Sequence, residues 1–294
     1  MKFDRHARRK LLSHSVAVLT GLAVVAVLYP LVSIVYEAAV RGGGVLFQNG
    51  FLTSVPPNGC TVVSCSTVGI GPAIVGSFIM VGLASLLAVP VGVMAGIFAS
   101  EYRTRGFGRA VSFTADVLSG VPSIIMGAFI YGYFVLYDPS STYSGFTGSL
   151  ALAAIMIPIV VRTTEEALRT VPNAMREAAI ALGISKWKMT LRIVLVAALP
   201  GVATGVLLAV MRTAGDAAPL IFTALGSNLY PHDLFHQPMP ALPLLIFNFA
   251  LSNESNWREV AWGATLFLLL VILITNIISR MVIHRLSEKM TGNA

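Results

Sequence analysis

This sequence contains unusually few charged residues. Only 11% of its 294 residues are Asp, Glu, Lys or Arg, while 56% are hydrophobic and the mean hydropathy is +0.80. Soluble domains contain about 25% charged residues, so a water-soluble globule of this composition would have too little polar surface to cover itself. The composition therefore predicts an all-α membrane protein that crosses the bilayer several times.

Several motifs of enzyme chemistry are missing as well. No G-x-x-x-x-G-K-[ST] loop is present, because none of the five lysines follows a glycine, and this excludes ATP binding through a P-loop. No H-E-x-x-H segment occurs, and the two cysteines, Cys60 and Cys65, share one segment rich in Gly, Pro and Ser. The sequence therefore gives no indication of metalloprotease activity or of catalysis by a cysteine thiol. Cys60 and Cys65 could form a disulfide or remain free thiols. The sequence does not decide between these alternatives, because the outcome depends on the redox state of the compartment.

Six apolar stretches are candidates for helices that cross a membrane, which takes about 20 residues. We expect these spans at about 11–36, 72–100, 117–137, 147–161, 200–225 and 260–279. Another apolar stretch, 238–250, is short and holds three prolines, so we expect it to pack on the outer face or to dip back into the membrane. We interpret the first span as a retained helix rather than a signal peptide, because its apolar run is long and no clear small-residue cleavage site follows.

The basic residues favour one side of these spans. Of the 20 lysines and arginines, all except Arg41, Arg212 and Arg258 fall before the first span, between the second and third, between the fourth and fifth, or after the last. Cytoplasmic segments are enriched in Lys and Arg, so the pattern predicts six crossings with both termini in the cytoplasm. This distribution, rather than a nucleic-acid partner, accounts for the net charge of +7.

The segment between the fourth and fifth spans has the pattern of a short helix. In PNAMREAAIALG (172–183), proline suits a first helical turn and Gly183 suits the left-handed position just past a helix end. Four residues spaced i, i+3, i+4 and i+7 predict one apolar face: Met175, Ala178, Ala179 and Leu182. We call this segment, about 172–190, the knob. On these grounds alone, a loop helix that rests on lipid headgroups is the plainest interpretation.

The knob resembles the EAA loop of binding-protein-dependent ABC transporter permeases. The resemblance consists of five residues at the family's spacing: Glu177, Ala178, Ala179, Gly183 and Ile193. In that family the loop is a coupling helix that sits in a groove of a cytoplasmic ATPase, so the resemblance assigns ATPase coupling to the first four of these residues. Val196 departs from the family pattern, which has proline there, and we expect Pro200 to begin the following helix instead.

Two further stretches are similar to the phosphate-uptake members of this family. LSGVPSIIMG (118–127) resembles their Gly-Val-Pro-Ser-Ile segment, and MRTAGDAAPLIFTA (211–224) resembles their Arg-x-x-Gly-Glu-x-Ala-Pro-Leu segment, with Asp216 in place of glutamate. The similarity covers nearly everything after about residue 71. We therefore expect residues 1–70 to hold a cytoplasmic tail, the first span and the external cysteine segment, and residues 71–294 to form the permease domain with the knob.

The resemblance implies a type I ABC importer permease fold in the cell (inner) membrane, and a set of partners. These are a second, distinct permease chain, two ATPase subunits that carry ATP and Mg, an external phosphate-binding protein, phosphate and membrane lipids. The chain itself is expected to need no cofactor and to be no enzyme. Two alternatives stay open. One is a permease for another solute such as molybdate or sulfate; the other is a membrane enzyme or docking subunit, in which substitution of Gly183 would leave transport intact.

An ionisable residue inside a span is costly and points to function. Arg212 lies 12 residues after Pro200, about 18 Å along a helix and near the middle of a ~30 Å core, and Asp216 follows on the same helix face. We predict both on an anion pathway. A guanidinium binds two phosphate oxygens, and a carboxylate accepts the proton that phosphate retains near neutral pH and sulfate lacks. The structural alternative is an Arg212–Asp216 ion pair that holds a helix break or meets the partner subunit.

Other charges near the spans are expected to have structural roles. We predict that Asp116 reaches the membrane interface or contacts Arg109. Glu165 and Glu166 precede Arg169 at helical spacing, which favours a solvated helix face beyond the fourth span.

Overall fold

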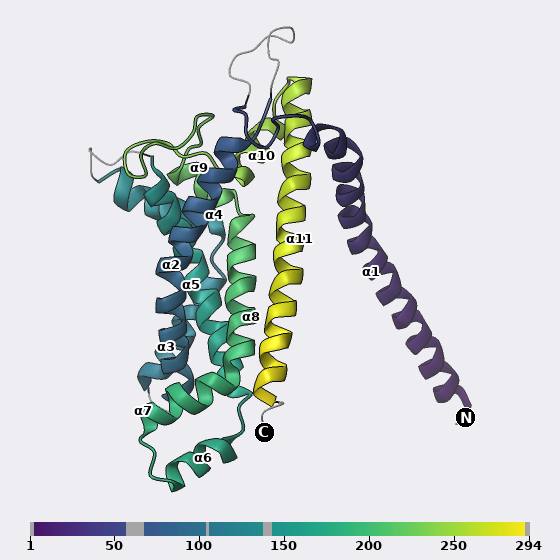
Figure 1. Cartoon of the computed structure of the whole chain (residues 1–294). Helices are drawn as coiled ribbons and strands as arrows, with labels where there is room; N and C mark the ends of the chain where they lie inside the picture. Colours follow the sequence, from purple (N-terminus) through teal and green to yellow (C-terminus); the bar gives the residue numbers. More distant parts are fainter. Residues whose placement is uncertain (1–2, 57–67, 104–105, 138–142, 292–294) are drawn as a thin grey trace.

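A computed structural model describes residues 3–56, 68–103, 106–137 and 143–291, and these ranges are almost entirely helical (Figure 1). Cys60 and Cys65, with their candidate disulfide, lie outside them. Within the described part, five helices are long and apolar enough to cross a membrane, and a sixth span is present if one bent pair of helices is counted as a single crossing. The predicted all-α, multi-span membrane protein is confirmed.

The long helices are α1 (Phe3–Leu46), α2 (Gly71–Glu101), α5 (Gly145–Arg169), α8 (Leu195–Ala214) and α11 (Ser255–Thr291). The bent pair is α3 (Gly106–Ser119) and α4 (Ser123–Ile130), with η1 (Tyr131–Val135) continuing α4. Four shorter helices and a π-helical turn complete the order: α6 (Asn173–Ala181), α7 (Lys186–Met189), η2 (Thr190–Val194), α9 (Ala218–Thr223) and α10 (Leu242–Ala250).

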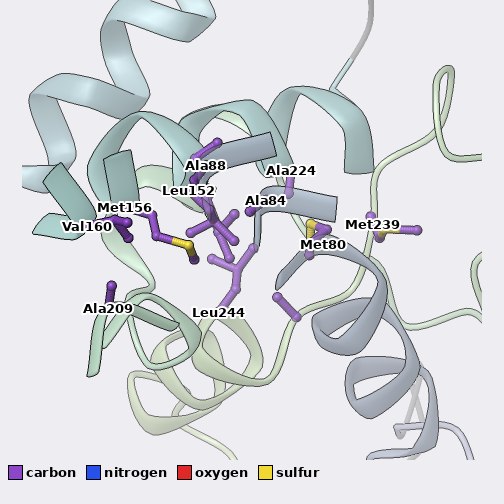
Figure 2. Packing of buried hydrophobic residues seen from close by; sticks show 13 residues of the cluster. Met80, Ala84, Ala88, Leu152, Met156, Val160, Ala209, Ala224, Met239 and Leu244 are labelled. Carbon is purple, nitrogen blue, oxygen red and sulfur yellow. The ribbon is translucent and has the colours of Figure 1, made fainter. Parts of the chain in front are cut away.

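The helices α2 and α5 form the centre of the bundle. A Cβ atom added to Gly92 or Gly96 of α2 would lie 2.7 Å from side-chain atoms of Val160 or Thr164 of α5, so these glycines let the two backbones approach closely. In a lipid environment such close packing, rather than escape from water, holds helices together. Residues of α8, α10 and the segments beside α9 also contribute to the buried cluster at this centre. Figure 2 shows its labelled members: Met80, Ala84, Ala88, Leu152, Met156, Val160, Ala209, Ala224, Met239 and Leu244.

A second cluster joins the end of α1 to α11, the last helix. Phe51, only 1% exposed, packs with Val45 of α1 and with α10 and α11. Gly42 of α1 lies against the carbonyl oxygen of Trp262, which would be 2.5 Å from an added Cβ. Away from this contact α1 diverges from the other helices (Figure 1), and its apolar window is 0% buried. The short helix α10 is buried against α11 and α2. Its nine residues are too few to cross a membrane, as expected for 238–250.

Two predicted spans differ from the observed helices. The third, expected as one helix over 117–137, is broken at Gly120–Pro122, and its halves are bent by 102°. Proline lacks an N–H and disfavours a helical conformation in the residue before it, which explains the break. The fifth, expected over 200–225, begins with α7 and ends at Ala214. Pro200 therefore lies inside α8 and does not begin it; membrane helices tolerate internal prolines.

The two ends of the chain lie at one end of the bundle. Figure 1 shows the first turns of α1, the last turns of α11 and the knob at the same end. This arrangement agrees with an even number of crossings. The cytoplasmic location of that end remains a prediction from the basic residues.

Candidate functional site

The two segments that resemble phosphate-uptake permeases meet in space. One forms the α3–α4 break and α4, and the other forms the end of α8 and α9. Gly127 of α4 packs directly on Pro219 of α9, and an added Cβ would lie 2.6 Å from the proline's Cα and carbonyl oxygen. A side chain at Gly127 would therefore separate the two short helices. Thr147 of α5 fixes the other end of α9, because its hydroxyl donates to the carbonyl of Thr223 at 2.9 Å.

Arg212 lies near the middle of the bundle and faces outward from this chain. Gly201 packs on Ala167 and Gly205 on Thr163, so the antiparallel register of α8 and α5 places Arg212 opposite about residue 156. That level is the middle of α5. The side chain is exposed on the single chain. A guanidinium at this depth faces a partner subunit or a water-filled path rather than lipid.

Asp216 does not share a helix face with Arg212, because α8 ends at Ala214 with Gly215 as its C-cap. That part of the sequence prediction is wrong. The carboxylate of Asp216 instead accepts a hydrogen bond from the N–H of Ala218 at 3.1 Å and forms an Asx turn just before α9, whose N-cap is Ala217. Across the described ranges, Arg212 and Asp216 form no ion pair with each other. The intrahelical ion pair, which was the structural alternative to a pathway role, is therefore not observed.

The surface of α8 around Arg212 is less apolar than a lipid-facing helix. Thr204, Leu208, Arg212 and Gly215 are exposed at helical spacing. Only Leu208 among them is a large hydrophobic residue. This surface suits contact with another protein chain or an aqueous route.

The knob has the local geometry that its sequence predicts. Gly183 has φ +76°, the left-handed conformation that glycine adopts without strain. Its N–H bonds to the carbonyl of Ile180 at 2.9 Å, and the N–H of Ile184 bonds to that of Ala179 at 3.1 Å. These two bonds form a Schellman motif, which ends α6 sharply and turns the chain toward α7. Pro172 stands one residue earlier than expected, at the N-cap.

Most of the apolar face of the knob is open. Ala179 is 4% exposed and packs against the bundle, but Leu182 is 80% exposed and Met175 42%. Glu177 and Ala178 are exposed too. Of the residues predicted to couple to an ATPase, Ala179 therefore packs against this chain, whereas Glu177, Ala178 and Gly183 are exposed and available to a second protein.

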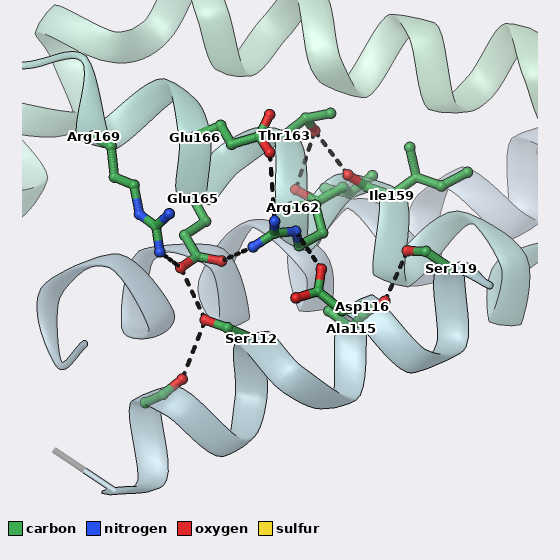
Figure 3. Close-up of polar contacts among 12 residues, drawn as sticks. Ser112, Ala115, Asp116, Ser119, Ile159, Arg162, Thr163, Glu165, Glu166 and Arg169 are labelled. Atoms are coloured by element: carbon green, nitrogen blue, oxygen red, sulfur yellow. Dashed lines mark hydrogen bonds and ion pairs between the residues drawn. The ribbon is translucent and has the colours of Figure 1, made fainter. Parts of the chain in front are cut away.

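A buried polar cluster joins α3 to α5 and was missed in the sequence (Figure 3). The side chain of Glu165 is 0% exposed, which contradicts the expected solvated face. It pairs with Arg162 at 3.1 Å and with Arg169, and it accepts a hydrogen bond from the hydroxyl of Ser112 on α3 at 2.9 Å. Two arginines and a hydroxyl therefore surround one buried carboxylate, as a buried charge requires.

Asp116 extends the same cluster. Its carboxylate lies 2.7 Å from Nε of Arg162, so its partner is on α5 and not the predicted Arg109. Glu166 has a 62% exposed side chain and lies 3.7 Å from Arg162, which fits the expected solvated position. The spacing of these charges was visible in the sequence, but their burial depends on α3 covering α5.

The chain matches known proteins over most of its length. Residues 88–288 match the family described as "Binding-protein-dependent transport system inner membrane component". The phosphate transport system permease protein PstA of Yersinia pestis is 40% identical over 215 residues, covering 73% of this chain and 72% of that protein. The PstA of Pasteurella multocida is 37% identical over 273 residues, covering 92% and 94%.

Solved structures share the fold at low identity. A chain of a bacterial alginate ABC transporter, crystallised with an alginate-bound periplasmic protein, superposes with a TM-score of 0.65 at 14% identity and covers 98% of this chain and 99% of that one. The predicted type I ABC importer permease fold is therefore confirmed. The chain belongs to the family of binding-protein-dependent transport system inner membrane components.

Proposed function

We propose that this chain is the permease subunit of an ATP-driven phosphate importer and forms half of its translocation pathway. The observation that carries the proposal is its similarity to PstA proteins over up to 92% of the chain. The Gly127–Pro219 contact supports it, because it brings together the two segments that resemble phosphate-uptake permeases.

ATP hydrolysis occurs on a separate pair of ATPase subunits in this proposal. The knob supplies the joint: Glu177, Ala178 and the exposed Leu182 form an open surface for the ATPase, while Ala179 and Gly183 shape and anchor it. A second permease chain completes the pathway. Its presence would also explain why Arg212 and the unburied window of α1 face outward from a single chain.

Phosphate specificity comes from Arg212 and Asp216. Arg212 offers positive charge and two N–H groups to the anion. Asp216 accepts the proton that phosphate retains near neutral pH, and a fully ionised sulfate would meet only repulsion there. The break between α8 and α9 lies beside both residues, and other membrane proteins bind ions at broken helices.

In this proposal, transport results from alternation of the spans between an outward-open and an inward-open arrangement. A loaded phosphate-binding protein docks outside, ATP closes the ATPase pair, and the knob conveys that closure to the helices. ATP can shift the spans between an outward-open and an inward-open arrangement only if it binds the two with different affinity. Both termini and the knob lie in the cytoplasm in this scheme.

Purification from native membranes followed by reconstitution tests the proposal. We expect a second permease chain and an ATPase to co-purify, and vesicles containing the complex and the binding protein to accumulate labelled phosphate only with ATP. Competition by excess sulfate or molybdate separates the substrates. Equal competition by either anion would overturn the phosphate assignment, and the absence of any co-purifying ATPase would overturn ATP-driven import.

A further inference from the structure

Glu101 is a buried carboxylate for which the proposed function has no role. It is the last residue of α2, and its side chain is 6% exposed. A negative charge at a helix C-terminus is unfavourable, because the helix dipole places partial negative charge there. Burial raises the cost further. Glu101 therefore depends on a positive partner, and that partner comes from the knob.

The partner is Arg176 of α6, whose side chain is 17% exposed. Its Nη1 group forms an ion pair with Glu101, and its Nη2 group donates to the carbonyl oxygen of Leu168 on α5 at 2.9 Å. A guanidinium is planar and rigid, so two such bonds fix its orientation. One side chain of the knob thus holds the adjacent ends of α2 and α5.

The other side of the knob, formed by α7, makes different contacts. Lys186 of α7 donates to the backbone carbonyl of Glu101 at 3.2 Å, and its ammonium group lies 4.5 Å from the centre of the Tyr102 ring. Beside these contacts is a cavity of about 250 Å³, lined in part by Phe98, Trp187 and residues of η2. The α6 side of the knob is therefore held to the ends of α2 and α5 by one guanidinium, whereas α7 continues through η2 into α8 and buries Met189 in the bundle.

We propose that the Glu101–Arg176 ion pair is the link through which movement of the knob reaches α2. The two are positioning residues for coupled transport, and the inference rests on the proposed function. Movement of α6 would displace the end of α2. Gly92 and Gly96 hold α2 tightly against α5, so we expect the two helices to move together. Tightly packed helices shift between discrete arrangements rather than deform continuously.

The same path continues to the broken span. Arg162 of α5 is paired with Asp116 of α3 at 2.7 Å, and Ser112 of α3 bonds to Glu165 at 2.9 Å. Displacement of α5 therefore acts on α3, the half of the span before the break. A contiguous series of contacts therefore joins the knob to α3, the first half of the broken span.

Three variants of the full chain, each purified with its partner subunits and reconstituted, test the link. The readout is phosphate accumulated per ATP hydrolysed in the same vesicles. We expect Glu101→Gln to lower this ratio about fivefold or more while ATP hydrolysis continues. The double variant Glu101→Met with Arg176→Met removes both buried charges, which proteins tolerate better than the loss of one. We expect it to assemble normally and still show the low ratio. Glu37→Gln breaks the exposed pair with Arg41 and should leave the ratio unchanged.

The outcomes separate this inference from the proposed function. A wild-type complex that fails to import phosphate with ATP contradicts the proposed function. If the wild type imports and the double variant matches its ratio, the pair only neutralises charge and the link is wrong. Failure of the double variant to assemble would also overturn the inference, because it would assign the pair to structural stability.

Discussion

Gly127 of α4 and Pro219 of α9 lie so close that a Cβ atom on the glycine would be 2.6 Å from both the Cα and the carbonyl oxygen of the proline. The two residues belong to separate sequence segments that each resemble phosphate-uptake permeases. Each segment contains a helix break, after Ser119 in one and after Ala214 in the other. The contact fixes the two short helices that come after these breaks against each other.

The first prediction concerns this contact. Gly127→Ala forces the backbone of α9 to move, and overpacking of this kind costs about 1–3 kcal/mol of stability. We expect a lower midpoint of thermal unfolding in detergent and less folded protein. Gly132→Ala is the matched control, because no atom lies within 4 Å of its added Cβ. Equal midpoints for the two variants would contradict the tight contact.

The buried carboxylate of the α3–α5 cluster provides the second prediction. Glu165→Gln keeps the size of the side chain but leaves Arg162 and Arg169 without its charge. Loss of hydrogen bonds to a charged group costs about 1.5–3 kcal/mol, and the two arginines, 29% and 36% exposed, keep some contact with solvent. Glu166→Gln alters an exposed neighbour with a 62% exposed side chain, and exposed pairs contribute about 0–1 kcal/mol. Denaturation of both variants in the same detergent measures the difference; similar losses would show that Glu165 is not buried.

The open surface of the knob provides the third. Leu182 is 80% exposed on the single chain, so Leu182→Gln should leave stability within about 0.5 kcal/mol of wild type. If an ATPase covers this side chain, the substitution should weaken its binding about tenfold or more. The fraction of ATPase that co-purifies measures this. Leu251→Gln, also exposed at 70% but beyond α10, should leave that fraction unchanged. Undiminished co-purification of the Leu182 variant would exclude this residue from the interface.

Arg212→Gln provides the fourth. Loss of one or two hydrogen bonds from a charged group to the anion, each about 1.5–3 kcal/mol, should lower phosphate uptake about tenfold to a hundredfold or more. Assembly should persist, because the side chain makes no ion pair among the described residues. Arg41→Gln, which removes an exposed arginine paired with Glu37, is the control. Normal uptake by the Arg212 variant would refute its place on the pathway.

Asp216→Asn provides the fifth. Asparagine keeps an oxygen that can accept from the N–H of Ala218, so the start of α9 is retained, but the negative charge that rejects sulfate is lost. We expect the preference for phosphate over sulfate to fall in competition assays. Asp233→Asn is the control, since Asp233 accepts a similar bond from the N–H of Phe235 at 2.8 Å in the segment between α9 and α10. An unchanged preference in the Asp216 variant would count against proton recognition by its carboxylate.

Much of the architecture was predictable because it depends on short stretches of sequence. A membrane span requires about 20 apolar residues wherever it lies in the chain, so the helices could be located from hydropathy. The left-handed Gly183 and the sharp end of α6 follow from the local preferences of glycine. The helix and turn of the knob were therefore predicted correctly. Its sequence did not indicate which of its apolar residues would be buried against the bundle.

Errors arose where a residue's neighbours come from elsewhere in the chain. Pro122 and Pro200 have the same chemistry, yet the first marks a bend of 102° and the second lies within a continuous helix. Their local sequences did not distinguish them, because surrounding helices and backbone adjustments determine whether a proline is tolerated. Asp216 was assigned to the wrong element for a related reason, since the end of α8 at Gly215 is set together with the packing of α9 on α4.

Sequence alone determined that this protein crosses a membrane, where most of its spans lie, how its knob folds and which family it resembles, because hydropathy and backbone preference are properties of a few adjacent residues. Tertiary structure alone decided that Glu165 is buried, that Glu101 belongs to Arg176 and that Gly127 rests on Pro219. These depend on contacts between helices distant in the chain, and the free energy of a charge or a glycine is set by its surroundings in three dimensions.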